Sequence, residues 1–392
     1  MEMHIQEQQI AIVGGGPGGL TLAKLLQQAG CRVNVLERDA DREVRQQGAT
    51  LDLHRDSGLK ALEVAGLMPE FRKRYRPGAD KVKVVDAALK MHFDDHESKQ
   101  IDAFDDAYFR PEIDRGPLRD LLIDSLEPGT ILWNRQFDSM EARGEGWLLH
   151  FKDGSTATAD LVIAADGANS KLRKYITAIQ PVYSGISVVE GNIYRAEHNA
   201  KHLFNLTAGG KVFALSNGQS LILSAKGDGS LSFYTGCKTP EDWASSGKVD
   251  FNSRASVFNW FKASFDTWSE SWWELFQSDE SYFVPRPMYH YPLDQSWASL
   301  PNLTMIGDAA HRMPPYAGEG VNMAMQDALE LYECLVDPGY NTRLEAIAAF
   351  EGIMCKRASG ITRLTLEQTE ALHSGEALTH LLTLFTNNHG EA

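Results

Sequence analysis

Five glycines and a proline follow an apolar run, as GGGPGG at residues 14–19, and this composition is typical of a turn that approaches a ligand closely. Gly14, Gly16 and Gly19 fit the spacing G-x-G-x-x-G, which suits a tight turn against a pyrophosphate. Glu37 ends the next alternating run, where a carboxylate can accept hydrogen bonds from a ribose. These residues predict a dinucleotide site.

A second glycine turn carries a carboxylate. Asp166 and Gly167 follow the apolar run LVIAA, and Ser170 lies shortly beyond them. A plain turn before a capped helix explains this pattern better than a ligand does, because Asp and Ser are both common helix caps. Taken alone, this segment therefore does not favour a ligand.

The richest segment is GDAAHRMPPYAGEGVN, which spans residues 307–322. Asp308 follows an apolar run and a glycine, so its carboxylate can face a ligand hydroxyl. Gly318 and Gly320 let backbone N–H groups approach a ligand at the start of a helix, whose positive end would stabilise negative charge. We interpret His311 as a structural hydrogen-bonding residue and expect no catalytic side chain.

The elements that would position these turns alternate between strand and helix. The first apolar run, a helical pattern over 19–30 and an alternating run at 32–38 form a β-α-β unit. A strand-rich middle follows, and the later apolar run LTMI is followed by a glycine, as the first strand is. This order predicts an α/β fold, with a Rossmann-like nucleotide-binding domain, an inserted β-rich substrate domain and a C-terminal helix. The expected boundaries are 1–75, 105–180 and 286–340 for the nucleotide-binding domain, 76–104 and 181–285 for the inserted domain, and 341–392 for the C-terminal helical segment.

Charge and composition exclude several classes of protein. The formal net charge of −15 argues against nucleic acid as a partner, because nucleic acid binding needs clustered Lys and Arg. The four cysteines are scattered without a CxxC pair, so neither a metal site nor a disulfide framework is expected. No stretch reaches about 18 apolar residues, and the start MEMHIQEQQ has no export pattern. We therefore expect a cytoplasmic protein without a membrane span.

The three glycine segments together, in order and spacing, resemble the class A FAD-dependent monooxygenases of the p-hydroxybenzoate hydroxylase-like fold. The resemblance implies that the first segment holds the ADP half of FAD and that the Asp-Gly turn supports the pyrophosphate and NAD(P)H use. The third segment would hold the ribityl chain and the flavin edge. The implied reactants are NADPH, with NADH as an alternative, molecular oxygen and an aromatic or polyketide-like small molecule, and a monomer is expected.

Within this family the chain is most similar to the tetracycline-inactivating monooxygenases, through stretches such as ERDADREVRQQGATLDLHRDSG, PEIDRGPLRDLLIDSL and KTPEDW. The resemblance implies that Arg38 approaches the adenosine, that Arg45 and Asp52 lie near the flavin or NADPH, and that Arg115 reaches the flavin side. The cofactor residues implied by the motifs and the resemblance are Gly14, Gly16, Pro17, Gly19, Glu37, Arg38, Arg45, Asp52, Arg115, Asp166, Asp308, Pro315, Gly318, Gly320, Val321 and Asn322.

The substrate pocket is where this chain departs from those enzymes. Their substrate strands carry a glutamine, an arginine and a histidine, and this chain has Glu190, Lys211 and Ser232 there. Lys lacks the planar fork of Arg, and Ser lacks the reach of His. The implied substrate residues are Glu190, Lys211, Phe213, Ser232, Pro315, Tyr316 and Gly318, and the C-terminal helix near Thr369 and His373 could close the pocket.

Three functions stay open at this stage. The first is a tetracycline-type monooxygenase, and the second is a sister hydroxylase of another phenol or polyketide-like ring, which the changed pocket residues favour. The third is a flavoprotein that binds a drug without oxygenating it. In the first two, reduced flavin would activate oxygen, and the protein would orient the substrate and exclude water.

Overall fold

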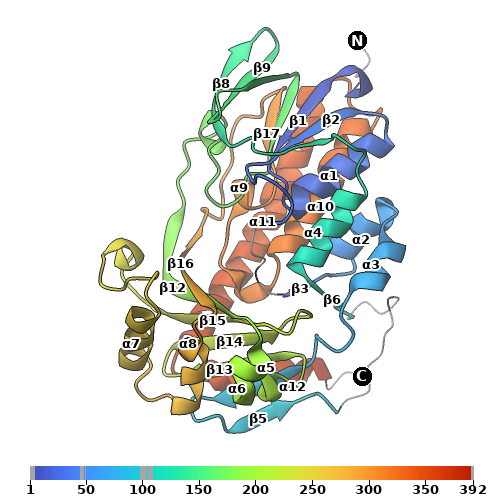
Figure 1. Ribbon diagram of the computed structural model, residues 1–392. Coiled ribbons are helices and arrows are strands. Elements are labelled where there is room, and N and C mark those ends of the chain that lie inside the picture. The colour runs from blue at the N-terminus through green and yellow to red at the C-terminus, as the bar shows by residue number, and fades with distance from the viewer. Residues whose placement is uncertain (1–4, 45–47, 49, 98–103, 105–108, 390–392) are drawn as a thin grey trace.

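The computed structural model describes residues 5–44, 48, 50–97, 104 and 109–389, with side chains described up to residue 386. Figure 1 shows two layers, an upper one built on a parallel sheet and a lower one built on a larger sheet. The long strands β12 (Val182–Ile193) and β16 (Ser281–His290) run between the layers. The predicted α/β fold class is confirmed, whereas the domain boundaries drawn from the sequence stay a prediction.

The upper sheet has five parallel strands in the order β17-β11-β1-β2-β7. Its strands are β1 (Gln9–Val13), β2 (Arg32–Leu36), β7 (Ile131–Leu132), β11 (Leu161–Ala164) and β17 (Leu303–Met305). Every residue of β11 is buried, as expected of a parallel strand whose two faces are both covered. The covering helices are α1 (Pro17–Gln28), α2 (Gly58–Val64), α3 (Met68–Arg74), α4 (Arg115–Asp124), α10 (Gly320–Val336) and α11 (Arg343–Leu372).

Helix α1 packs closely on α10 because the sequence removes side chains between them. A Cβ added to Gly18 would lie 2.8 Å from the carbonyl oxygen of Ala324, and one added to Gly19 would lie 2.3 Å from that of Gly14. Pro17 occupies the first turn of α1, where its missing N–H costs nothing. These glycines therefore allow the turn, strand β1 and helices α1 and α10 to pack closely against one another.

The lower sheet has seven strands in the order β16-β12-β15-β14-β13-β4-β5. Its pairs are antiparallel except for the parallel pair of β13 with β4. The remaining strands are β4 (Val82–Asp86), β5 (Met91–Asp94), β13 (Lys211–Ser216), β14 (Gln219–Ala225) and β15 (Leu231–Lys238). The helices beside this sheet are α5 (Ala196–Asn199), α6 (Lys201–Thr207), α7 (Arg254–Ser264) and α8 (Glu274–Gln277), with the 3-10 helices η3 (Trp243–Ser245) and η4 (Glu270–Trp273).

One face of the lower sheet packs on these helices through an aromatic core. Phe233 on β15 contacts Phe276 on α8, and Phe261 on α7 stacks against Phe265. Side chains alternate along each strand, so the neighbouring residues of β12, β13 and β15 point to the opposite face. That opposite face is directed toward the upper layer.

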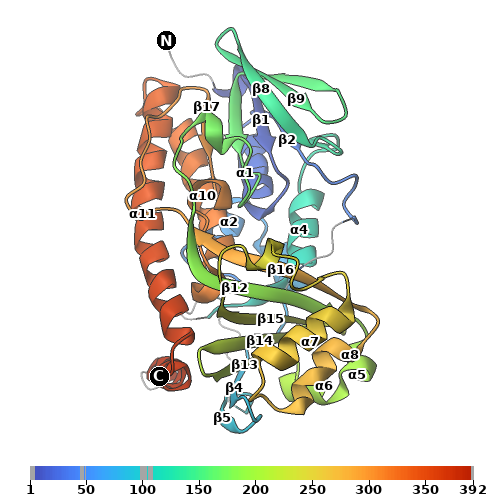
Figure 2. The same ribbon diagram turned by 90° about the vertical axis from the view of Figure 1, so that its left-hand side faces the viewer.

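Two small sheets and the last helices complete the fold. Strands β3 (Thr50–Asp52) and β6 (Glu112–Asp114) pair antiparallel between the layers, and β8 (Phe137–Arg143), β9 (Gly146–Phe151) and β10 (Thr156–Ala159) form a separate sheet. Figure 2 shows α11 running along one side of the molecule past both layers, with α12 (Ala377–His389) at its lower end. Among the described residues, no helix combines the length and apolar character needed to cross a bilayer.

Candidate functional site

The three glycine segments meet at one edge of the upper sheet. Strands β1, β11 and β17 are parallel neighbours, so their carboxyl ends lie together. Gly14 has φ +116°, and a Cβ added there would lie 2.2 Å from the carbonyl oxygen of Ala165, the residue before Asp166. A Cβ on Gly307, before Asp308, would lie 3.1 Å from Ala324 on α10. Segments far apart in the sequence thus share one site.

Open space lies in front of two helix N-termini at this edge. A Cβ added to Gly16, at the start of α1, or to Gly320, at the start of α10, would meet no described atom within 4 Å. Both helices are long enough to carry a positive end and free backbone N–H groups. Asp166 adds a buried Oδ1 without a hydrogen-bond partner among the described residues, and burial raises its pKa. These features fit the pyrophosphate and polyol of FAD.

Glu37 is buried beneath the glycine turn. Its carboxylate accepts hydrogen bonds from the backbone N–H of Gly15 at 2.7 Å and of Asp39 at 3.0 Å. In the structure these hydrogen bonds stabilise the turn itself, and the predicted contact of Glu37 with a ribose is untested. Arg38 is exposed two residues beyond the end of β2, whereas Arg45 lies outside the described residues.

Arg119 is a buried cation that the sequence argument missed. From α4 it donates to the carbonyl oxygen of Gly15 at 3.3 Å and to Asp39 Oδ2 at 3.1 Å. Its side chain is 4% exposed. The available signal was a charged residue on the apolar face of α4, beside Leu118 and Leu122. Arg119 therefore fixes the glycine turn from below.

A buried charge network holds the turn before Asp308. Asp327 on α10 accepts from the backbone N–H of Gly307 at 2.7 Å and also pairs with His311 and Arg357. Burial opposes charge on His311, but the Asp327 carboxylate outweighs it and raises the His311 pKa. The buried pairing of His311 with Asp327 is that of a structural residue. Asp308 itself is exposed at the first position of α9 (Asp308–His311).

Asp52 and Asn322 join the small β3-β6 sheet to the start of α10. Asn322 Nδ2 donates to the carbonyl oxygen of Asp52 at 2.9 Å, and its Oδ1 accepts from the backbone N–H of His54 at 2.8 Å. A Cβ on Gly318 would lie 3.5 Å from Asp52 Oδ1. Val321 lies beside Asn322 in the first turn of α10. The structure thus brings these predicted residues together.

His54 forms an ion pair with Asp52 within this cluster. Its Nε2 lies 3.0 Å from Asp52 Oδ2, and its Nδ1 lies 3.5 Å from Glu319. Burial disfavours both charges, but their mutual hydrogen bond outweighs it, which lowers the pKa of Asp52 to about 2 and raises that of His54 to about 9. At neutral pH the pair is therefore a carboxylate and an imidazolium.

The predicted substrate residues of the lower sheet share one face. Phe213 stands opposite Ile222, Ile222 opposite Tyr234, and Tyr234 opposite Glu190. The adjacent row contains Lys211 and Ser232, with Ser224 between them. The opposite face is closed, since a Cβ on Gly191 would lie 2.2 Å from the Phe233 ring. We call the face that carries Glu190 and Lys211 the inner face.

Two charged residues of the inner face already have partners. Lys211 forms an ion pair with Glu112 of β6, and Glu190 accepts from Arg286 Nε at 2.9 Å. Burial opposes charge on Lys211, but the Glu112 carboxylate outweighs it and raises the Lys211 pKa. A substrate would therefore meet paired rather than isolated charges at these positions.

Gly48 marks the contact between the cofactor side and the substrate side. A Cβ added there would lie 3.4 Å from Glu190 Oε1 and from the Tyr234 hydroxyl, and 3.8 Å from Arg115 Nε. Arg115 begins α4 and is exposed, so this cation lies beside the inner face. The expected contact of Arg115 with the flavin side stays a prediction.

The loop after α9 reaches the inner face through Tyr316. This residue lies in the turn η5 (Pro315–Ala317), and its hydroxyl lies 3.2 Å from His373 Nε2 at the end of α11. Ser220 lies 3.1 Å from the same nitrogen, and His373 Nδ1 donates to the carbonyl oxygen of Thr369 at 2.7 Å. Burial lowers the His373 pKa, so the ring is neutral. Helix α11 therefore anchors the loop that carries Pro315 and Gly318.

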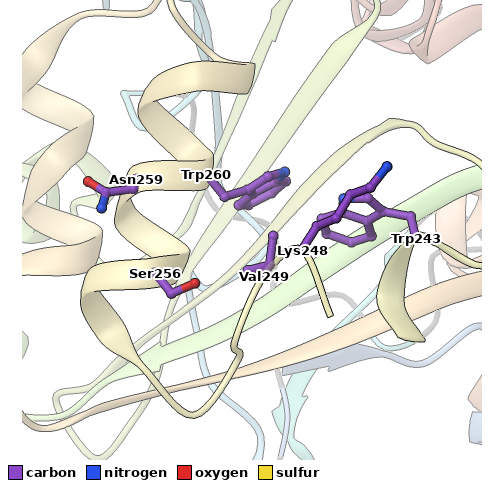
Figure 3. A pocket seen from close by; sticks show the side chains of 6 residues that line it. All are labelled: Trp243, Lys248, Val249, Ser256, Asn259 and Trp260. Carbon is purple, nitrogen blue, oxygen red and sulfur yellow. The ribbon is translucent and has the colours of Figure 1, made fainter. Parts of the chain in front are cut away.

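An open hollow on the outer side of the lower layer is separate from this site. Figure 3 shows it around the start of α7 and η3. It is lined by Trp243, Lys248, Val249, Ser256, Asn259 and Trp260. Val249 belongs to the aromatic core on the helical face of the sheet, so the hollow lies on the side away from the inner face.

Comparison with known proteins agrees with the geometry at the edge of the upper sheet. The family model described as "FAD binding domain" matches residues 7–190 and 299–342. Monooxygenase penA of Penicillium thymicola is 30% identical, with 92% of this chain and 94% of that protein covered.

Two solved structures share the fold. HpxO of Klebsiella pneumoniae complexed with FAD and uric acid has a TM-score of 0.74 at 19% identity, and 97% of this chain and 92% of that chain are covered. Tetracycline destructase Tet(55) has a TM-score of 0.75 at 18% identity, with 96% and 92% covered. At these identities the likeness shows the fold alone. FAD, the predicted cofactor, is confirmed by the family match, whereas the choice between NADPH and NADH is untested.

Proposed function

Because the chain belongs to the FAD-dependent monooxygenases, we propose that it uses NAD(P)H and molecular oxygen to hydroxylate an aromatic or enolic polyketide-like substrate. One observation supports this most strongly: helix α4 contacts the first glycine turn through Arg119, and Arg115 of the same helix lies beside Gly48, which also contacts Glu190 of the inner face. Bound FAD supplies the redox chemistry that activates oxygen, and the chain supplies binding, orientation and exclusion of water.

Named residues divide this work between them. The N-termini of α1 and α10, with Gly16 and Gly320 leaving room, would hold the pyrophosphate and stabilise negative charge on the flavin. Asp308 would bind the ribityl hydroxyls. Tyr316, anchored by His373, would border the reacting ring.

For the substrate, we propose a phenolic or enolic ring smaller than tetracycline. Tet(55) shares the fold, whereas Lys211 here is paired with Glu112 and Glu190 with Arg286. These pairs leave fewer free charges for the many oxygens of a tetracycline. They favour the second candidate, a sister hydroxylase of a smaller phenolic or enolic ring.

The test is turnover by the FAD-loaded protein. Tetracycline, simple phenols and bicyclic enols are incubated with NADPH under labelled oxygen gas, and products are examined by mass spectrometry. A product that carries one labelled oxygen atom supports the proposal. NADPH oxidation that yields only hydrogen peroxide with every compound, or stoichiometric binding without NADPH oxidation, contradicts it.

The reductant, the oligomeric state and the location belong to the same proposal. We propose NADPH as the preferred reductant, a monomer and a cytoplasmic protein. Initial rates with NADPH and NADH, and light scattering after size-exclusion chromatography, test the first two.

A further inference from the structure

The inner face contains a pair of buried polar side chains that the protein leaves unsatisfied. Asn192 on β12 and Ser232 on β15 stand directly opposite each other in the antiparallel pair. They are 1% and 2% exposed. Both atoms of the Asn192 amide and the Ser232 hydroxyl have no hydrogen-bond partner among the described residues. Buried polar groups in folded proteins are nearly always paired, so this cluster needs an explanation.

Strand register places Asn192 on the substrate side of the sheet. Glu190 lies two residues earlier on β12 and therefore on the same face. The intervening Gly191 lies against the Phe233 ring of the aromatic core. Asn192 therefore points away from that core and lies on the inner face with Glu190 and Lys211.

The other polar groups of this row do not satisfy the pair. Lys211 is engaged by Glu112, and neither Ser224, opposite Ser232, nor Tyr282, opposite Asn192, is hydrogen-bonded to the pair. One row along, Phe213, Ile222 and Tyr234 offer rings and an aliphatic side chain to a flat ligand. The inner face thus combines an apolar floor with a neutral polar end.

The chemistry of a primary amide limits what can satisfy Asn192. Its carbonyl oxygen accepts and its amino group donates, and the two atoms lie side by side in one plane. A ligand edge with an N–H next to a C=O matches both at once, in the way that Asn pairs with the edge of adenine. The Ser232 hydroxyl can then serve the second lone pair of the ligand carbonyl.

We propose that Asn192 and Ser232 read the lactam edge of an aromatic N-heterocyclic substrate, such as a hydroxylated pyridone or quinolone. This inference rests on the proposed function, because it takes the inner face as the substrate site. It makes Asn192 a specificity-determining residue. A carbocyclic ring of the same shape leaves the amide unpaired and binds more weakly.

The probes are 4-hydroxy-2(1H)-quinolone and its carbocyclic isostere 1,3-dihydroxynaphthalene, which differ at the lactam N–H and carbonyl. Their dissociation constants are measured by calorimetry on FAD-loaded protein without NADPH and without oxygen. We expect the quinolone to bind at least about tenfold more tightly. Asn192→Leu should weaken the quinolone about 10- to 100-fold and leave the isostere within about threefold. Ser232→Ala should weaken the quinolone by a smaller factor.

Two controls separate recognition from structure. Asn192→Leu should keep or raise the thermal midpoint, because it removes an unpaired polar group from the interior. Asn259→Leu, at an exposed residue of the outer hollow, should change neither dissociation constant. If Asn192→Leu lowers the thermal midpoint and weakens both probes alike, the amide holds a structural water and the inference is wrong.

Turnover distinguishes this inference from the proposed function. Asn192-dependent quinolone binding without labelled product from any compound would contradict the hydroxylase proposal and leave the recognition intact. Equal binding of both probes, or binding of neither, would overturn the recognition, while hydroxylation of another ring would still support the hydroxylase.

Discussion

His54 lies between the carboxylates of Asp52 and Glu319, and we expect the fold to lose stability at alkaline pH, where the imidazolium loses its charge. Its folded pKa of about 9, against an ordinary value of 6.5, is a shift of about 2.5 units, or about 3 kcal/mol. The side chain is 14% exposed, so solvent screens the pair only modestly. Because the folded pKa is raised, the contribution is complete below pH 6.5 and is lost as pH rises through 9.

The perturbation is His54→Gln, which keeps a polar side chain and removes the charge. Asp52, with a pKa of about 2, stays ionised throughout this window, so the wild-type change comes from the imidazole. Free energies of unfolding in urea are measured at pH 6 and pH 10 with saturating FAD. The difference between wild type and variant should shrink by up to about 3 kcal/mol between the two values.

His202→Gln, at an exposed histidine, is the matched control and should leave the pH dependence unchanged. A wild-type-to-variant difference that is the same at pH 6 and pH 10 would refute the ion pair. An NMR titration that places the His54 pKa near 6.5 would refute it directly.

Further predictions concern the glycine turns and the network behind them. Gly14→Ala should destabilise the fold by about 2–4 kcal/mol, because φ at this position is positive and the added Cβ would overlap the carbonyl of Ala165. Gly16→Ala should have the thermal midpoint of the wild type and retain less flavin, because its Cβ would enter open space. Equal thermal midpoints for the two variants would contradict this. Asp308→Ala should lower the ratio of flavin to protein absorbance without lowering the urea midpoint of the FAD-free protein; unchanged FAD content would contradict its role. Asp327→Ala should cost about 3–5 kcal/mol in urea unfolding, because it leaves the buried His311 and the backbone N–H of Gly307 without their acceptor, and a loss below about 1 kcal/mol would count against the network.

Local patterns predicted much of the upper layer. Glycine spacing after an apolar run predicted the turn at Gly14, because few other residues adopt its backbone or fit against a neighbouring strand. In the sequence, Asp153-Gly154 between two alternating runs predicts a hairpin and KVKVVDAALKMHF predicts an antiparallel strand pair; the pairings of β9 with β10 and of β4 with β5 confirm both. The helical pattern over 55–75 is divided into α2 and α3, since Gly66 with φ +71° lies between them.

Contacts between distant segments could not be predicted in this way. Nothing in the sequence near Arg119 indicates that it will donate to Gly15, 104 residues earlier. The pairing of Lys211 with Glu112 and the contact of His373 with Ser220 likewise join separate elements. Asn192 looks like an ordinary strand residue until its neighbours are known to leave its amide unpaired.

The amino-acid sequence by itself determined where the chain turns, which strands are buried and that a dinucleotide fits the glycine segments, because these depend on backbone freedom and side-chain period over a few residues. Only the tertiary structure decided which charges neutralise one another and which polar groups remain for a substrate. Hydrogen bonding and desolvation depend on distances between elements, and those distances exist only after the two sheets have packed together.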